Sequence, residues 1–171
     1  KNRMNKRSNR LAVLLLSALI SVQVFAQEKF PDGTPIPDWF RKNEVVNIKT
    51  LGKVYRITDY GVANDSTILQ TEKIQSIIDR AQQEGGGVVV IPQGTFLSSS
   101  LFFKPKTHLY LEKNAVLKGS DDISNFPIVE TRMEGQTLKY FPALVNADHV
   151  DGFTISGEGT LNGKGMRYWK S

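Results

Sequence analysis

The strongest constraint on this chain is a spaced set of apolar residues that recurs three times. Each set is an apolar pair two residues apart, followed by a leucine six residues further on. The sets are Val89, Ile91 and Leu97; Leu109, Leu111 and Leu117; and Phe153, Ile155 and Leu161. Because alternate side chains of a strand point to the same face, a spacing of two predicts strands.

The distance between the sets predicts how the strands are arranged. The first two sets lie twenty residues apart, and the third follows forty-four residues after the second. A constant period of about 20 residues is typical of stacked coils, each of which buries its apolar face on its neighbours. We therefore predict a right-handed parallel β-helix, an all-β solenoid, with a polar insertion at residues 121–142 interrupting the third coil. The chain supplies about three coils, so we expect it to be truncated at the C-terminus.

One segment has the periodicity of a helix rather than a strand. Residues 67–84 carry apolar side chains at three- and four-residue spacing, which places them on one helical face. These side chains are Ile74, Ile77, Ile78 and Ala81. Thr67 and Gln70 could form a capping box at the start, and the glycines at 85–87 end the helix. We expect this α-helix to cover the apolar N-terminal end of the first coil.

The N-terminus has the layout of a secretory signal peptide. Five basic residues precede an apolar run from Leu11 to Ile20, and small residues near Ala26 suit cleavage. We predict a signal peptide at 1–26, an extended N-terminal arm at 27–53, and a β-helix body at 54–171. The predicted location is therefore exported, either periplasmic or extracellular, with no stable membrane span after cleavage.

Removal of the signal peptide changes the charge balance. Residues 1–26 hold five of the 22 Lys and Arg residues and none of the 17 Asp and Glu residues. The mature chain is then neutral, which gives no basis for nucleic-acid binding. The absence of cysteine excludes disulfides, thiolate metal sites and thiol catalysis.

Several motifs that suggest chemistry are better explained as turns. The glycines at 85–87 follow a helix, whereas a phosphate-binding loop precedes one. Asp121 and Asp122 are neighbours, and glycoside hydrolysis needs two carboxyls that flank one bond. Asp148 and His149 have no nucleophile or second acid nearby in sequence. We assign no catalytic residue and no metal ligand.

Four segments of the chain together resemble glycoside hydrolase family 28, the polygalacturonases and related pectin hydrolases. The segments are Ile57–Val62, the helix up to Gly87 together with Val88–Leu97, Leu109–Ser120, and Phe153–Trp169. Residues 63–66 replace the usual Gly-Asp-Gly, and Asn162 replaces the usual Asp. The first half alone is less specific, because β-helix lyases and phage tailspikes begin in a similar way.

The resemblance implies a function for the complete protein. Members of the family cleave chains of α-linked galacturonic acid by inverting hydrolysis, without a cofactor. Their three catalytic aspartates lie on coils that would follow Ser171, so the resemblance implies that this chain alone is inactive. The implied partner is a pectic polysaccharide or an oligogalacturonide. Arg132, Lys139 and Tyr140 are the candidate substrate contacts, because cations bind sugar carboxylates and aromatic rings cover sugar faces.

Other interpretations remain open at this point. The three candidate residues could belong to a solvated loop with Tyr140 and Phe141 tucked beneath it. A polysaccharide lyase or a uronate epimerase could use the same scaffold. A non-catalytic glycan-binding β-helix, such as a tailspike or an adhesin, is the third possibility.

Overall fold

The computed structural model describes residues 29–40 and 46–167. The chain divides into two compact units, residues 1–44 and 45–171. The predicted signal peptide lies outside the described residues, as does Trp169. Within the part that is described, no helix combines the length and the apolar character needed to cross a membrane.

The described part of the first unit has local structure of its own. Lys29 and Pro35 form an antiparallel bridge, and a short 3-10 helix, η1 (Asp38–Phe40), follows. The ring of Trp39 stacks on Phe40 with 4.0 Å between centroids, and both rings remain more than half exposed. The predicted N-terminal arm therefore contains a closed turn and an exposed aromatic pair.

The second unit consists mainly of short strands. The strands are β1 (Val54–Arg56), β2 (Gly87–Ile91), β3 (Gly94–Ser98), β4 (Leu101–Phe102), β5 (Thr107–Leu111), β6 (Ala115–Gly119), β7 (Val129–Met133), β8 (Gln136–Tyr140), β9 (Val145–Asn146), β10 (Ile155–Gly157) and β11 (Thr160–Asn162). The helical elements are η2 (Ile48–Leu51), η3 (Ile57–Tyr60), α2 (Thr71–Gln83), η4 (Ile123–Asn125) and η5 (Gly165–Arg167).

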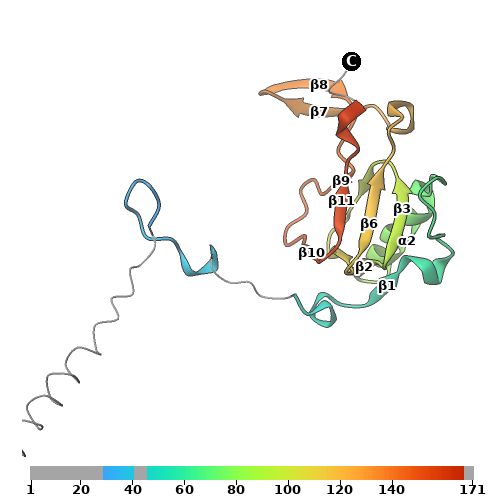
Figure 1. Ribbon diagram of the computed structural model, residues 1–171, viewed down its shortest axis with the longest axis horizontal. Helices are drawn as coiled ribbons and strands as arrows, with labels where there is room; N and C mark the ends of the chain where they lie inside the picture. Colours follow the sequence, from blue (N-terminus) through green and yellow to red (C-terminus); the bar gives the residue numbers. More distant parts are fainter. Residues whose placement is uncertain (1–28, 41–45, 168–171) are drawn as a thin grey trace, which may run out of the picture. The chain divides into compact units, whose positions relative to one another are not determined.

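Most of these strands pair in parallel, as the sequence predicts. The hydrogen-bonded orders are β1-β2-β5-β10, β11-β6-β3 and β4-β9, and every pairing within them is parallel. Figure 1 shows β11, β6 and β3 side by side. The exception is an antiparallel hairpin formed by β7 and β8, which falls within the predicted polar insertion.

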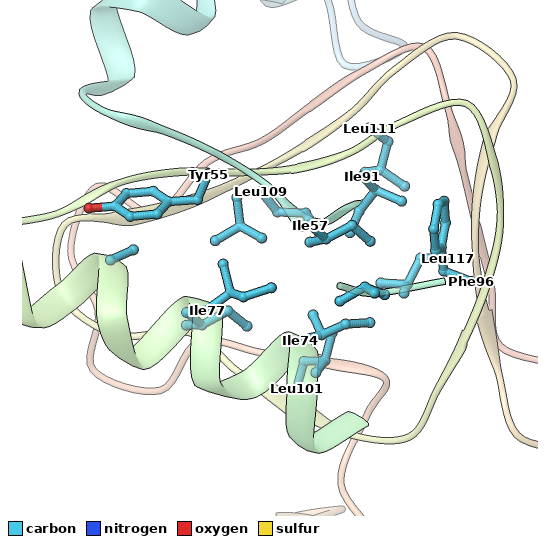
Figure 2. Close-up of a cluster of buried hydrophobic side chains, with 14 of the residues drawn as sticks. Tyr55, Ile57, Ile74, Ile77, Ile91, Phe96, Leu101, Leu109, Leu111 and Leu117 are labelled. Carbon is cyan, nitrogen blue, oxygen red and sulfur yellow. The ribbon is translucent and has the colours of Figure 1, made fainter. Parts of the chain in front are cut away.

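The inward-facing side chains are in register from strand to strand. Two such rows are Val89–Leu109–Ile155 and Phe96–Leu117–Leu161. The first two members of each row are fully buried, whereas Ile155 and Leu161 at the end of the rows are 47% and 42% exposed. Figure 2 shows Leu109 and Leu117 in one cluster with helical side chains. Burying a side chain of this size contributes about 1.5–3 kcal/mol, so these rows supply much of the stability of the second unit.

The register of the first apolar set differs from the predicted one. Phe96, rather than Leu97, takes the inward position opposite Leu117, and Leu97 is only half-buried. The reason is turn length. Two residues separate β2 from β3, whereas three residues, 112–114, separate β5 from β6. A constant offset in sequence therefore selects the wrong residue of β3.

The apolar pair of the third set is also shifted, by two residues, whereas Leu161 lies opposite Leu117 as predicted. Ile155 pairs with Leu109 and Gly157 with Leu111, whereas Phe153 precedes the strand. The amides of Glu158 and Gly159 both donate to the carbonyl of Leu111, at 3.0 and 3.2 Å. A Cβ atom at Gly157 would lie 1.9 Å from that carbonyl oxygen, and the φ of this residue is +102°. The chain can turn this tightly only because residue 157 has no side chain.

Helix α2 is shorter than predicted, although its apolar face is as expected. It covers Thr71–Gln83 instead of residues 67–84. The four apolar residues of the predicted face are all buried. The expected glycine end is confirmed, because the amide of Gly86, at φ +110°, donates to the carbonyl of Ala81 at 2.8 Å.

The predicted capping box is wrong because its residues have other partners. The hydroxyl of Thr67 donates to Asp65 at 2.6 Å. The side-chain amide of Gln70 donates to the carbonyl of Ala63 at 2.7 Å and accepts from its amide at 2.6 Å. Leu69 forms a parallel bridge with a residue of β3. Strand-like pairing therefore continues up to residue 70, and the helix can begin only after it.

Polar side chains of α2 take the place of a strand beside β4. The side-chain carbonyl of Gln75 accepts from the amide of Phe102 at 2.8 Å, and its NH₂ group donates to the carbonyl of Phe102 at 2.9 Å. The hydroxyl of Thr71 accepts from the amide of Ser99 at 2.7 Å. These bonds satisfy backbone groups that would otherwise lack partners beneath the helix.

We expect the substitution Gln75→Met to destabilise the second unit by about 1–3 kcal/mol, since two backbone groups of Phe102 lose their partners. Gln82→Met is the matched control, because Gln82 is exposed on the same helix. Urea unfolding followed by circular dichroism measures both. Equal stability of the two variants would contradict a role for Gln75 as a substitute strand.

Candidate functional site

An open groove of about 730 Å³ lies between the β7–β8 hairpin and the sheet β4-β9. We call it the hairpin groove. Its lining includes Phe102, Glu130, Arg132, Thr137, Asn146 and Asp148. Grooves of this volume are typical of small-molecule and cofactor sites.

The register of the hairpin sorts its side chains onto two faces. Glu130 lies opposite Lys139, and Arg132 lies opposite Thr137. Residues directly opposite each other on antiparallel strands share a face. Glu130, Arg132 and Thr137 of this face line the groove, and Val129 and Thr131 of the other face line it as well.

The structure separates the three predicted substrate contacts. Arg132 lines the groove, and Lys139 occupies the same hairpin face beside it. Tyr140 follows Lys139 on the strand and therefore belongs to the other face. Its ring is 40% exposed and stacks on Phe141 with 4.2 Å between centroids, while Phe141 is half-buried. Of the three predicted residues, Arg132 is the one that lines the groove.

A single asparagine holds the loop that forms one wall of the groove. The NH₂ group of Asn146 donates to the carbonyls of Ala143 and Leu101 at 2.7 and 3.1 Å. Its side-chain carbonyl accepts from the amide of Ala143 at 3.1 Å. These bonds tie the two-residue strand β9 to β4, and they fix the backbone that carries Asn146 and Asp148 along the groove.

Phe102 is a groove residue that sequence reasoning missed. Leu101 and Phe103 are buried in the core, so Phe102, between them on the strand, points outward. The sequence signal that could have identified it is the alternation of inward and outward positions within residues 101–103. A run of three apolar residues does not by itself reveal which face is the core.

Two other candidate motifs behave as turns. The carboxylate of Asp122 accepts from the amide of Ser124 at 3.0 Å and from its hydroxyl at 2.8 Å, which confirms the capping turn expected there. Nδ1 of His149 lies 2.7 Å from the carboxylate of Asp148, and both side chains are more than 90% exposed. A fully solvated pair of this kind is poorly placed to do acid–base chemistry.

A separate charge cluster joins the end of α2 to β1. The carboxylate of Glu84 accepts from the ammonium of Lys53, from Arg80 Nε at 2.7 Å and from the Tyr55 hydroxyl at 2.9 Å. The hydrogen bonds from Lys53 and then Arg80 lower the pKa of Glu84 to about 2. The ring of Tyr55 is buried, so the cluster anchors an element of the core.

The described residues offer binding groups rather than a catalytic set. Among residues 29–40 and 46–167, no three His, Asp or Glu side chains are grouped so as to hold a metal ion. The hairpin groove presents a guanidinium, two carboxylates, an aromatic ring and an amide. Such groups can recognise a polar ligand of extended shape.

Comparison with known proteins identifies the class. Residues 54–167 match the family described as "Rhamnogalacturonase A/epimerase, pectate lyase-like", and the chain belongs to this family. It is similar to an exo-poly-alpha-D-galacturonosidase from Dickeya chrysanthemi, with 34% identity over 66% of this chain and 18% of the relative. The resemblance to the polygalacturonases of glycoside hydrolase family 28 is thereby confirmed over this part of the chain.

Two further similarities are informative. The crystal structure of an exopolygalacturonase from Thermotoga maritima matches with a TM-score of 0.61 and 27% identity, over 66% of this chain and 25% of that one. A plasmin and fibronectin-binding protein A from Streptococcus pneumoniae is 30% identical over 74% of this chain and 19% of that protein. The chain spans a quarter or less of the length of these relatives.

The low pKa of Glu84 predicts how stability depends on pH. Its ordinary pKa is 4.5, and the folded value is about 2. The ionised carboxylate therefore stabilises the fold above its ordinary pKa, and this contribution is lost as the pH falls from 4.5 towards 2. We expect Glu84→Gln to be less stable than the parent near neutral pH and equally stable near pH 2, as measured by urea unfolding at each pH.

The control for this measurement is Glu134→Gln, which removes an exposed carboxylate from the turn between β7 and β8. Its stability relative to the parent should vary little over the same pH range. A constant difference between Glu84→Gln and the parent at every pH would show that the cluster does not act through the charge of Glu84.

Proposed function

We propose that this chain is the N-terminal part of an exported glycoside hydrolase that cleaves α-linked galacturonic acid chains of pectin by inverting hydrolysis. The observation that carries the proposal is the family match over residues 54–167. It is supported by relatives named as galacturonan-degrading enzymes. Export, through a signal peptide at residues 1–26 to the periplasm or the extracellular space, is part of the same proposal.

The architecture we propose for this enzyme is a right-handed parallel β-helix. The three parallel sheets would form the faces of its coils, and the in-register apolar rows would form its interior. Helix α2 would cover the first coil, because its apolar face packs in the core and Gln75 pairs with β4 as a strand would. The β7–β8 hairpin would be the insertion that borders the binding cleft.

In this proposal the chain contributes substrate binding and leaves the catalytic carboxylates to later coils. Arg132 is placed to bind a sugar carboxylate in the hairpin groove, and Lys139 lies on the same hairpin face. A guanidinium can bind a carboxylate with two parallel hydrogen bonds. Tyr140 lies opposite Val129, which also lines the groove, so it would contribute to a substrate that extends along that face of the hairpin.

Two other functions are favoured by specific observations. The family description includes epimerases and refers to pectate lyases, so a lyase or epimerase is one alternative. The relative named as a plasmin and fibronectin-binding protein favours the other alternative, a non-catalytic binding module.

The complete product of the gene that encodes this chain tests the proposed reaction. We expect it to release reducing ends from pectic polymers with inversion at the anomeric carbon, as followed by proton NMR. Residues 27–171 alone should release none. Unsaturated sugars among the products would indicate a lyase. Glycan binding without any turnover would indicate a binding module.

Arg132 provides a test of the groove in the same enzyme. We expect Arg132→Met to raise KM for galacturonan by about tenfold and leave kcat unchanged, because a charge-assisted hydrogen bond contributes about 1.5–3 kcal/mol. Lys49→Met is the control, because Lys49 is exposed on η2 and is not among the residues of the groove. An unchanged KM in Arg132→Met would remove Arg132 from the substrate site.

A further inference from the structure

A second groove meets the hairpin groove at Phe102. Its volume is about 550 Å³, and it runs along α2, so we call it the helix groove. Its lining includes Leu69, Glu72, Gln75, Asp79, Phe102 and Pro127. Phe102 is the one residue that lines both grooves.

The main chain of Phe102 is held on both sides. Gln75 binds its amide and its carbonyl from the helix side, and β9 pairs with it from the other side, where Phe102 lies opposite Asn146. A partly exposed aromatic ring on a fixed backbone offers a flat apolar surface at low entropic cost. Such a ring between two grooves is suited to stack on one sugar of a chain whose neighbouring sugars enter the grooves.

The charges along the two grooves are predominantly negative. The helix groove is lined by Glu72 and Asp79 and by no Lys or Arg. The hairpin groove is lined by Glu130 and Asp148 and by Arg132. The two linings together hold four carboxylates and one guanidinium, and Lys139, opposite Glu130 on the hairpin, supplies a second cation. Nδ1 of His149 lies 2.7 Å from Asp148, and Gln75 donates to Asp79 at 3.0 Å, so each of these two carboxylates has a polar neighbour.

This charge pattern restricts the ligand. A fully de-esterified galacturonan carries a carboxylate on every sugar, and it would place several of them close to carboxylates of the protein. Like charges a few ångströms apart repel by about 1 kcal/mol each in a solvated site. A single uronate could still pair with Arg132, provided that the sugars beside it are uncharged.

We propose that Phe102 and the two grooves that meet at it bind a pectic chain of low charge, in which esterified or neutral sugars flank an acidic one. The proposal rests on the pectic function proposed above and specifies its substrate class. Phe102 is then a binding residue that stacks on a sugar, and the groove carboxylates select against fully acidic chains.

Binding of the full chain to two polymers of equal length tests the proposal. One is polygalacturonate, and the other is the same polymer with most of its carboxyls methyl-esterified. We expect the full chain to bind the esterified polymer about fivefold or more tightly, as measured by affinity electrophoresis at low salt. Added salt should reduce the difference, because it screens the repulsion.

Variants separate the charge from the aromatic ring. Glu130→Gln with Asp148→Asn should reduce the preference for the esterified polymer to about twofold or less. The matched control is Glu134→Gln with Asp151→Asn, which removes the same charge from exposed turns outside both grooves and should leave the preference unchanged. Phe102→Leu should weaken the binding of both polymers by about two- to tenfold, and Phe102→Trp should restore it.

Each outcome has a definite meaning. Preference for polygalacturonate, or a preference that Glu130→Gln with Asp148→Asn leaves unchanged, would overturn the inference. The pectin hydrolase would stand in that case if the complete gene product still cleaved pectin. Binding of neither polymer would overturn the inference as well, and failure of the complete gene product to act on any pectic polymer would overturn the proposed function. If Phe102→Leu does not fold, the charge variants still decide the outcome.

Discussion

The structure of the second unit depends on the vertical alignment of inward side chains on parallel strands that are only two to five residues long. Strands this short make few backbone hydrogen bonds, so the buried apolar rows must supply the cohesion. The row Phe96–Leu117–Leu161 illustrates the constraint, since its members lie opposite one another on adjacent strands and the first two are fully buried. The turns must then have lengths that keep the rows in register. Gly157 serves this purpose by allowing close approach to Leu111.

Short strands also leave backbone groups without strand partners at the edge of each sheet. Backbone groups at an edge need partners, and β4 has only the short strand β9 on one side. Side chains of α2 supply hydrogen-bond partners for this edge, Gln75 for the backbone of Phe102 and Thr71 for the backbone of Ser99. An element that buries an apolar face thereby also completes a sheet. The grooves lie on either side of this join, so the chemistry of the candidate site rests on the packing of the core.

Much of the fold could be predicted from the sequence, because the spacing of apolar residues reports strand and helix periods directly. The strands around Val89 and Leu109 and the buried face of α2 follow from it. The register could not be predicted, since it depends on single-residue differences in turn length that the periodicity does not contain. The first residue of α2 could not be predicted either. Gln70 is hydrogen-bonded to the loop at Ala63, and Thr71 is hydrogen-bonded to Ser99, which is distant in sequence.

The candidate site was harder to predict than the fold. Arg132 could be proposed because a cation in a polar insertion suits an acidic ligand. Tyr140 lies on the opposite hairpin face, a fact that only the pairing of β7 with β8 decides. Phe102 and the groove carboxylates come from segments up to 76 residues apart, Glu72 to Asp148, and their meeting is a result of the tertiary fold. No local sequence pattern predicts that these residues lie close together.

The two hydrogen bonds between the side chain of Gln75 and the main chain of Phe102 have a mechanical consequence. These bonds link the helix to the backbone from which the partly exposed ring of Phe102 projects. Any shift of α2 along its axis must either break these hydrogen bonds or move the ring together with the helix. The orientation of the Phe102 ring thus depends on the packing of a helix whose apolar side chains are buried.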